Sequence, residues 1–129
     1  MNQFQATISQ IVSKGSLHIV KFTFGSTLLT MVSLELSDKL KVNTLVNLSV
    51  NPNYIALARE TSPQLSYSNQ IESTIRAIEK GAILSRVELL ENGTYFESII
   101  TSESLDRMQL AVGDKVVMLM KASEIYLRD

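Results

Sequence analysis

The sequence Asn2-Gln3-Phe4-Gln5-Ala6-Thr7-Ile8 returns in altered form as Asn69-Gln70-Ile71-Glu72-Ser73-Thr74-Ile75 in the second half of the chain. In both places apolar and polar residues alternate with a period of two, which is typical of a β-strand with one buried face. The alternation then changes phase before the next apolar residue, at Ile11 and again at Ile78. This phase change predicts a β-bulge or a sharply coiled strand, and both suit a small closed barrel.

The correspondence continues beyond these strands and divides the chain into two tandem copies. Val42-Asn43-Thr44-Leu45-Val46 lines up with Val112-Gly113-Asp114-Lys115-Val116. The polar residues between the copies include Ser and Pro, which is typical of a linker. We therefore expect a first module over residues 1–60, a linker over residues 61–68 and a second module over residues 69–129.

Turn signals predict the secondary structure within each module. They divide each copy into about five short strands, which indicates an all-β protein of two tandem OB-like five-stranded barrels, each with at most a short helix. Residues 101–108 combine helix formers with a serine N-cap candidate and acidic residues in the first turn, so we expect the helix there. The matching stretch Leu36-Ser37-Asp38-Lys39-Leu40 is expected to form one turn at most.

The composition excludes several classes of function. The 129 residues carry a net charge of −1 and 6% aromatic residues, so neither a nucleic acid nor a membrane surface is an expected partner. The absence of cysteine excludes disulfides, Cys-ligated zinc, iron–sulfur clusters and thiol nucleophiles. His18 is the single histidine, so a His-cluster metal site is excluded as well.

The sequence also contains no arrangement that is typical of a catalyst. It has no Gly-rich phosphate loop, no Ser/His/Asp set and no paired carboxylates suited to acid–base work, so we expect neither an enzyme nor an organic cofactor. The first residues match no secretory signal and no stretch approaches transmembrane length, which predicts a cytoplasmic location.

Five motifs of the second copy follow one another in a specific order. They are Asn69-Gln70, Ile78-Glu79-Lys80-Gly81-Ala82, Ser98-Ile99-Ile100-Thr101-Ser102-Glu103-Ser104, Val112-Gly113-Asp114-Lys115-Val116 and Lys121-Ala122-Ser123-Glu124-Ile125. Together they resemble the Mop modules, also called TOBE domains, of bacterial molbindins and of molybdate-responsive regulators and transporter ATPases. The resemblance covers both copies and is stronger in the second. It implies an OB-like fold in which modules hold tetrahedral molybdate or tungstate at their interfaces.

The resemblance also implies a set of ligand residues. Thr101 and Ser104 match a Thr and a Ser three residues apart before the short helix, and Lys121 matches the lysine of a Lys-Ala-Ser/Thr run. Ser66 falls in the place of a serine that precedes the first strand, and Ser68 stands where the family has an arginine. The expected oxyanion-binding residues are Thr101, Ser104, Lys121, Ser66, Ser68, Ser102 and Ser123.

The first copy matches the ligand pattern less well. Leu34 and Ser37 stand in the Thr and Ser places, and Asn51 stands in the lysine place. We therefore expect the site of the first module to be degenerate and assign oxyanion binding to the second.

The chemistry of the ligand supports this assignment. A dianionic tetrahedral oxyanion needs convergent hydrogen-bond donors and positive charge, which the helix start at residues 101–105 and Lys121 would supply. On residue type alone, the serines of this stretch fit helix capping better and the lysine fits a solvated position. Phosphate stays open as a ligand, because Glu103 and Asp106 are possible acceptors for its proton.

These observations predict a function and an assembly. We expect intracellular storage or homeostasis of molybdenum through binding of molybdate or tungstate. The alternative is a regulatory or assembly module of a molybdate transporter or transcription regulator, with weak or no oxyanion binding. Because each barrel is small, a homo-oligomer is expected, with a trimer favoured over a dimer.

Overall fold

The computed structural model describes residues 1–128 and contains ten strands, one α-helix and two 3-10 helices in that range. The strands are β1 (Asn2–Lys14), β2 (Leu17–Phe24), β3 (Thr27–Ser33), β4 (Leu45–Val50), β5 (Ala56–Ala58), β6 (Asn69–Lys80), β7 (Leu84–Glu91), β8 (Thr94–Thr101), β9 (Lys115–Met120) and β10 (Ile125–Arg128). The helix is α1 (Ser102–Arg107), and the 3-10 helices span Pro52–Tyr54 and Ala122–Glu124. Within residues 1–128 no helix has the length and apolar character needed to cross a membrane.

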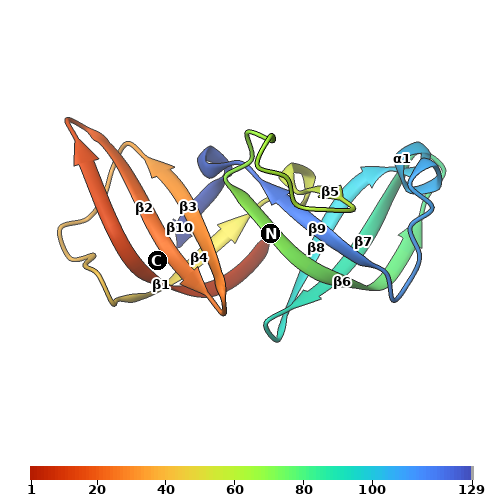
Figure 1. Ribbon diagram of the computed structural model, residues 1–129, viewed down its shortest axis with the longest axis horizontal. Helices are drawn as coiled ribbons and strands as arrows, with labels where there is room; N and C mark the ends of the chain where they lie inside the picture. Colours follow the sequence, from red (N-terminus) through yellow and green to blue (C-terminus); the bar gives the residue numbers. More distant parts are fainter. Residues whose placement is uncertain (129) are drawn as a thin grey trace.

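The strands form two curled five-stranded sheets that lie next to each other along the long axis of the molecule (Figure 1). One sheet has the order β10-β4-β1-β2-β3 and the other the order β5-β9-β6-β7-β8. The prediction of an all-β chain with two five-stranded units and a short helix is confirmed.

The two sheets exchange strands. β5 of the first repeat pairs antiparallel with β9, where Leu57 faces Met118, and β10 of the second repeat pairs antiparallel with β4, where Ile125 faces Val50. Each sheet therefore takes four strands from one repeat and the fifth from the other. The boundary at residues 61–68 separates the repeats in sequence, whereas in space each unit contains residues from both sides of it.

The predicted bulges are confirmed in both long strands. The register of β1 with β2 shifts between Ile8 and Gln10, and that of β6 with β7 shifts between Ile75 and Ala77. The Ile8 N–H donates instead to the Thr44 carbonyl at 2.9 Å, outside the regular ladder. The shift turns the buried face of the strand and lets the sheet curl around its core.

The core continues from one repeat into the other. Phe4 and Phe24 of the first repeat and Phe96 of the second form three edge-to-face pairs, with ring centroids 5.2 to 5.8 Å apart. All three rings are buried. Such pairs add to the hydrophobic burial and fix the angle at which rings meet, so they hold the two sheets in one arrangement.

Two buried asparagines attach each repeat to the other. Asn69 Oδ1 accepts from Thr30 N–H at 2.6 Å, and its Nδ2 donates to Thr30 O at 2.9 Å. Asn2 repeats this arrangement with the N–H and carbonyl of Glu97, at 2.7 and 2.8 Å. Each side-chain amide thus bonds to one backbone N–H and one backbone carbonyl, as a neighbouring strand would. We call these two contacts the asparagine clamps.

The short helix is confirmed, but its cap differs from the prediction. The N-cap is Thr101, whose Oγ1 accepts from the Ser104 N–H at 3.1 Å. No serine caps the helix, because Ser102 already has helical geometry and is buried. In the first repeat the matching residues form a single turn, closed by Leu40 N–H donating to Ser37 O at 3.0 Å.

Candidate functional site

A pocket of about 420 Å³ brings three of the predicted ligand residues together. Thr101 and Ser104 come from the end of β8 and the start of α1, and Lys121 comes from the end of β9. The pocket also draws on the first repeat, because its lining includes residues 53–55, at the end of the first 3-10 helix, and Ala56, the first residue of β5. Its lining residues are Asn53, Tyr54, Ile55, Ala56, Tyr67, Ile99, Ile100, Thr101, Ser104, Lys121 and Glu124.

Two of the larger hollows suit an oxyanion less well. One, of about 570 Å³, is lined by three glutamates, at positions 60, 72 and 91, against the cations Arg59 and Lys115. The other, of about 720 Å³, is lined by leucines and valine together with Ser37, Glu35 and Arg128. Neither contains any of the predicted ligand residues, so size alone does not identify the site.

The Ser104 hydroxyl is oriented by two donors. The Thr101 hydroxyl donates to Ser104 Oγ at 2.8 Å, and Arg107 Nη2 donates to the same oxygen at 3.1 Å. The Ser104 hydroxyl proton has no acceptor in the part of the chain that the structure describes. The Thr101 hydroxyl is therefore engaged with Ser104, and Ser104 is the hydroxyl of this pair whose proton is available.

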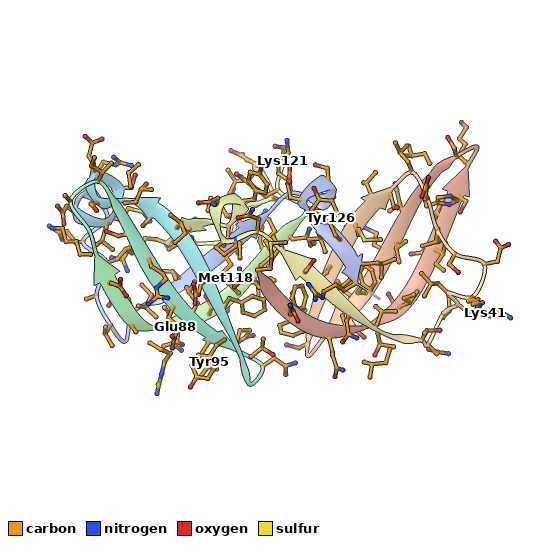
Figure 2. All side chains as sticks on the ribbon, turned by 180° about the vertical axis from the view of Figure 1, so that it is seen from behind. Lys41, Glu88, Tyr95, Met118, Lys121 and Tyr126 are labelled. Atoms are coloured by element: carbon orange, nitrogen blue, oxygen red, sulfur yellow. The ribbon has the colours of Figure 1, made fainter. Side chains whose placement is uncertain are left out.

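Lys121 is the positive charge of the pocket. Its side chain is exposed, and within residues 1–128 it has neither an ion-pair nor a hydrogen-bond partner. Figure 2 shows it at the outer rim of the molecule, above Tyr126. At the matching position of the first repeat, Asn51 Oδ1 caps the 3-10 helix by accepting from Asn53 N–H at 2.9 Å. Lys121 and Asn51 therefore make different interactions, although they occupy matching positions of the two repeats.

An acidic group lies in the same pocket and the same 3-10 turn as this lysine. Glu124 lines the pocket, and its Oε2 accepts a hydrogen bond from the Tyr126 hydroxyl at 3.3 Å. Partial desolvation, followed by the charge of Glu124, raises the pKa of Tyr126 above its ordinary value. The carboxylate offsets part of the lysine charge, so binding of an anion depends on the donors of the pocket as well as on net charge.

The linker is fastened to β6 and brings Tyr67 to the pocket. Gln70 Oε1 accepts from Ser62 N–H at 2.8 Å, and its Nε2 donates to Ser62 O and Tyr67 O at 2.9 and 3.0 Å. The Asn-Gln pair that opens the second repeat is therefore structural: Asn69 attaches the repeats and Gln70 fixes the linker.

The remaining predicted residues lie outside the pocket lining. Ser66, Ser68 and Ser123 are exposed. Ser102 is buried, and its Oγ lies 2.7 Å from Ser85 Oγ and donates to Gly81 O at 2.7 Å. This side chain anchors the start of α1 to the β6–β7 turn and does not reach the pocket.

The helix start offers fewer unpaired amides than the sequence predicted. Ser102 N–H donates to Ile83 O at 2.8 Å, and Ser104 N–H donates to Thr101 Oγ1. The expectation that residues 101–105 present unpaired N–H groups is thus wrong for these two amides. Among the side chains of the pocket, Ser104 and Lys121 keep donor protons that no group within residues 1–128 accepts.

Sequence reasoning missed two contributors to the site. Residues 53–56 belong to the degenerate repeat and reach the pocket because the first 3-10 helix packs against β8 and β5 pairs with β9, which no pattern in the sequence indicates. Arg107 follows Ser104 by three residues, a spacing that places two side chains on one helix face, and this signal was available.

Comparison with known proteins identifies the family. Residues 65–127 match the model of the TOBE domain. The chain belongs to the TOBE domain family. Its fold matches a molybdate-bound structure of the cytoplasmic molybdate-binding protein ModG with a TM-score of 0.90 and 28% identity, over 98% of this chain and 94% of ModG.

Two further proteins are similar to this chain. A molybdate-binding protein from Sporomusa ovata aligns with 51% of this chain and 98% of its own, with a TM-score of 0.50 and 32% identity. The molybdenum transport protein ModE of Herbaspirillum seropedicae is 28% identical over 138 residues, which cover 98% of this chain and 49% of ModE. The chain thus spans about half the length of ModE, and the resemblance to tandem Mop modules is confirmed.

Proposed function

We propose that this tandem TOBE protein binds molybdate or tungstate and thereby stores or buffers molybdenum in the cytoplasm. The observation that carries the proposal is that Lys121, which lacks a partner among residues 1–128, lines one pocket with Thr101 and Ser104. The likeness to molybdate-bound ModG over nearly the whole chain supports the choice of ligand.

Each pocket residue has a distinct task in this proposal. Ser104 donates its proton to an oxygen of the anion, while Thr101 holds the Ser104 oxygen in position. Lys121 adds a charge-assisted hydrogen bond from the opposite wall, and such bonds are stronger than neutral ones. The Tyr67 side chain narrows the pocket from the linker side.

We also propose that the protein forms a homo-oligomer and that it is not an enzyme. We infer a homo-oligomer, with a trimer favoured over a dimer, since the exposed serines at positions 66 and 68 are then available to a neighbouring subunit. The lining residues provide donors, one cation and one carboxylate, which suits reversible binding without bond making. Light scattering that finds a monomer, both with and without molybdate, would contradict the assembly.

Equilibrium dialysis tests the binding proposal with molybdate, tungstate, sulfate and phosphate. Lys121→Ala is expected to weaken molybdate binding about tenfold or more, because it removes a hydrogen bond to a charged group. Lys41→Ala is the matched control, since Lys41 is exposed and lies at one end of the molecule, far from Lys121 (Figure 2). Equal affinity in wild type and Lys121→Ala would refute the site. Absence of binding by the wild type would favour an assembly module instead.

A further inference from the structure

The acidic side chain of the pocket is an acceptor that binding of molybdate does not use. Glu124 lines the pocket together with Ser104 and Lys121. Its Oε2 accepts from the Tyr126 hydroxyl at 3.3 Å, and its other carboxylate oxygen has no donor within residues 1–128. No ion pair joins Glu124 to Lys121 in that range. The carboxylate therefore stays available to a ligand.

An acceptor in an anion pocket separates tetrahedral oxyanions by their protons. Near neutral pH molybdate and sulfate carry no proton, so all their oxygens accept and a neighbouring carboxylate repels them. Phosphate and arsenate carry one or two protons at the same pH and keep at least two unprotonated oxygens. Such an ion can accept from Ser104 and Lys121 while its own O–H donates to a carboxylate. A charge-assisted hydrogen bond of this kind is roughly twice as strong as a neutral one.

We propose that Glu124 is a specificity-determining residue that enables the pocket to bind protonated tetrahedral oxyanions, phosphate and arsenate, in addition to molybdate. The inference rests on the proposed function, because it uses the same pocket and the same donors. Ser104 and Lys121 hold two unprotonated oxygens of the ion, and Glu124 accepts a hydrogen bond from a protonated one. The same carboxylate weakens binding of the unprotonated ions, so it sets the relative affinity of the two classes.

The acceptors that the sequence suggested for a phosphate proton lie elsewhere. Both oxygens of the Asp106 carboxylate accept from Lys80 Nζ, at 2.8 and 3.0 Å, and the Glu103 side chain is 90% exposed. Neither acid lines the pocket. Asn53 does line it, but its amide is a neutral acceptor. Glu124 is thus the one carboxylate among the lining residues of the described chain.

Glu124 can be substituted without disturbing the local fold. The backbone hydrogen bond of its turn, from Glu124 N–H to Lys121 O at 2.9 Å, does not involve the side chain. Glu124→Gln keeps the size of the side chain and replaces the charged acceptor with a neutral amide. Glu124→Asp keeps the charge and withdraws it by one methylene, so it distinguishes a hydrogen bond from a general effect of charge. Glu103→Gln removes a charge outside the pocket and is the matched control.

Binding of labelled molybdate, and its displacement by three other anions, measures the selectivity at one neutral pH. Phosphate and sulfate are a small pair of nearly equal size, of which phosphate alone is protonated. Arsenate and molybdate are a larger pair, of which arsenate alone is protonated. The phosphate-to-sulfate and arsenate-to-molybdate affinity ratios therefore report the effect of the proton separately from that of size.

Both ratios are expected to fall about fivefold or more in Glu124→Gln, because the protonated ions lose a charge-assisted hydrogen bond and the unprotonated ions lose a repulsive neighbour. The affinities for molybdate and sulfate themselves are expected to rise. Glu124→Asp is expected to lower both ratios as well, since its shorter side chain withdraws the acceptor from the ion. Glu103→Gln is expected to keep both ratios at the wild-type values.

Three results would overturn the inference. Phosphate could fail to displace molybdate from the wild type, or the ratios could stay unchanged in Glu124→Gln. Ratios that are equal in the wild type and Glu124→Asp but lower in Glu124→Gln would show that Glu124 repels dianions and accepts no proton. In each case the wild type still binds molybdate and the proposed function stands. A wild type that binds none of the four anions would overturn the proposed function and this inference together.

Discussion

Replacing Asn69 with alanine removes one of the two asparagine clamps between the repeats. The Asn69 side chain is fully buried and makes two hydrogen bonds to the backbone of Thr30, on the edge strand of the other sheet. The substitution leaves an N–H and a carbonyl without their partners and opens a small cavity at the contact between the sheets.

The expected loss in the free energy of unfolding follows from these two hydrogen bonds. Each buried group left unpaired costs about 1–3 kcal/mol, and Thr30 is half-buried, so water restores part of the loss and the expected destabilisation is about 2–4 kcal/mol. Asn2→Ala is expected to cost a similar amount, because Asn2 makes the equivalent pair of bonds to Glu97. Asn47→Ala, at an exposed position of β4, is the control and is expected to change stability by less than about 0.5 kcal/mol.

Urea unfolding followed by far-ultraviolet circular dichroism measures these changes. Because the sheets share strands and a core, we expect a single transition whose midpoint falls in Asn69→Ala while its slope stays constant. A loss below about 1 kcal/mol, or one equal to that of Asn47→Ala, would refute the view that the clamp stabilises the contact between the repeats.

The remaining predictions concern the helix anchor, the pocket and the response to pH. Ser102→Ala is expected to lower the free energy of unfolding by about 1–3 kcal/mol in the same urea assay, since Gly81 O loses its buried donor. Molybdate at a hundredfold excess over Kd is expected to stabilise the protein by about 2.7 kcal/mol, seen as a rise in Tm, and Ser104→Ala is expected to remove most of that rise. The raised pKa of Tyr126 favours the protonated phenol in the folded state, so its contribution to stability is present below pH 10.0, the ordinary value, and is lost as pH rises through the folded pKa. Tyr126→Phe should therefore flatten the alkaline limb of the stability curve, and an unchanged limb would contradict this.

Local patterns predicted the elements of this fold well. Alternation with a period of two identified the long strands, and the phase changes located the bulges, because both features record which side chains face the core. The position of the short helix was also predictable from its helix formers. Its cap was not, because serine is the better cap by type and favours Ser102, whereas in the structure Ser102 is buried beside Ser85 and Thr101 is the cap.

The strand exchange could not be predicted from the sequence. β5 is three residues long and all three are half-buried, so it has no alternation that would indicate a face or a partner. The same limit applies to the site. Thr101, Ser104 and Lys121 were predicted from the family pattern, whereas the place of residues 53–56 in the pocket depends on packing and pairing between segments that are far apart in sequence.

The exchange of β5 and β10 has a consequence for how the two copies evolve. In an assembly of two identical chains, every substitution occurs in both partners, so a change that spoils one pocket spoils the other as well. Here the covalent link keeps the two copies at a high effective concentration whatever their sequences. A substitution in one copy therefore leaves the other copy unchanged. The first copy can therefore carry Leu34 and Asn51 in the places of the ligand pattern as long as it supplies β5 to its neighbour. A tandem chain thus allows one copy to carry the ligand pattern while the other contributes residues 53–56 to the same pocket.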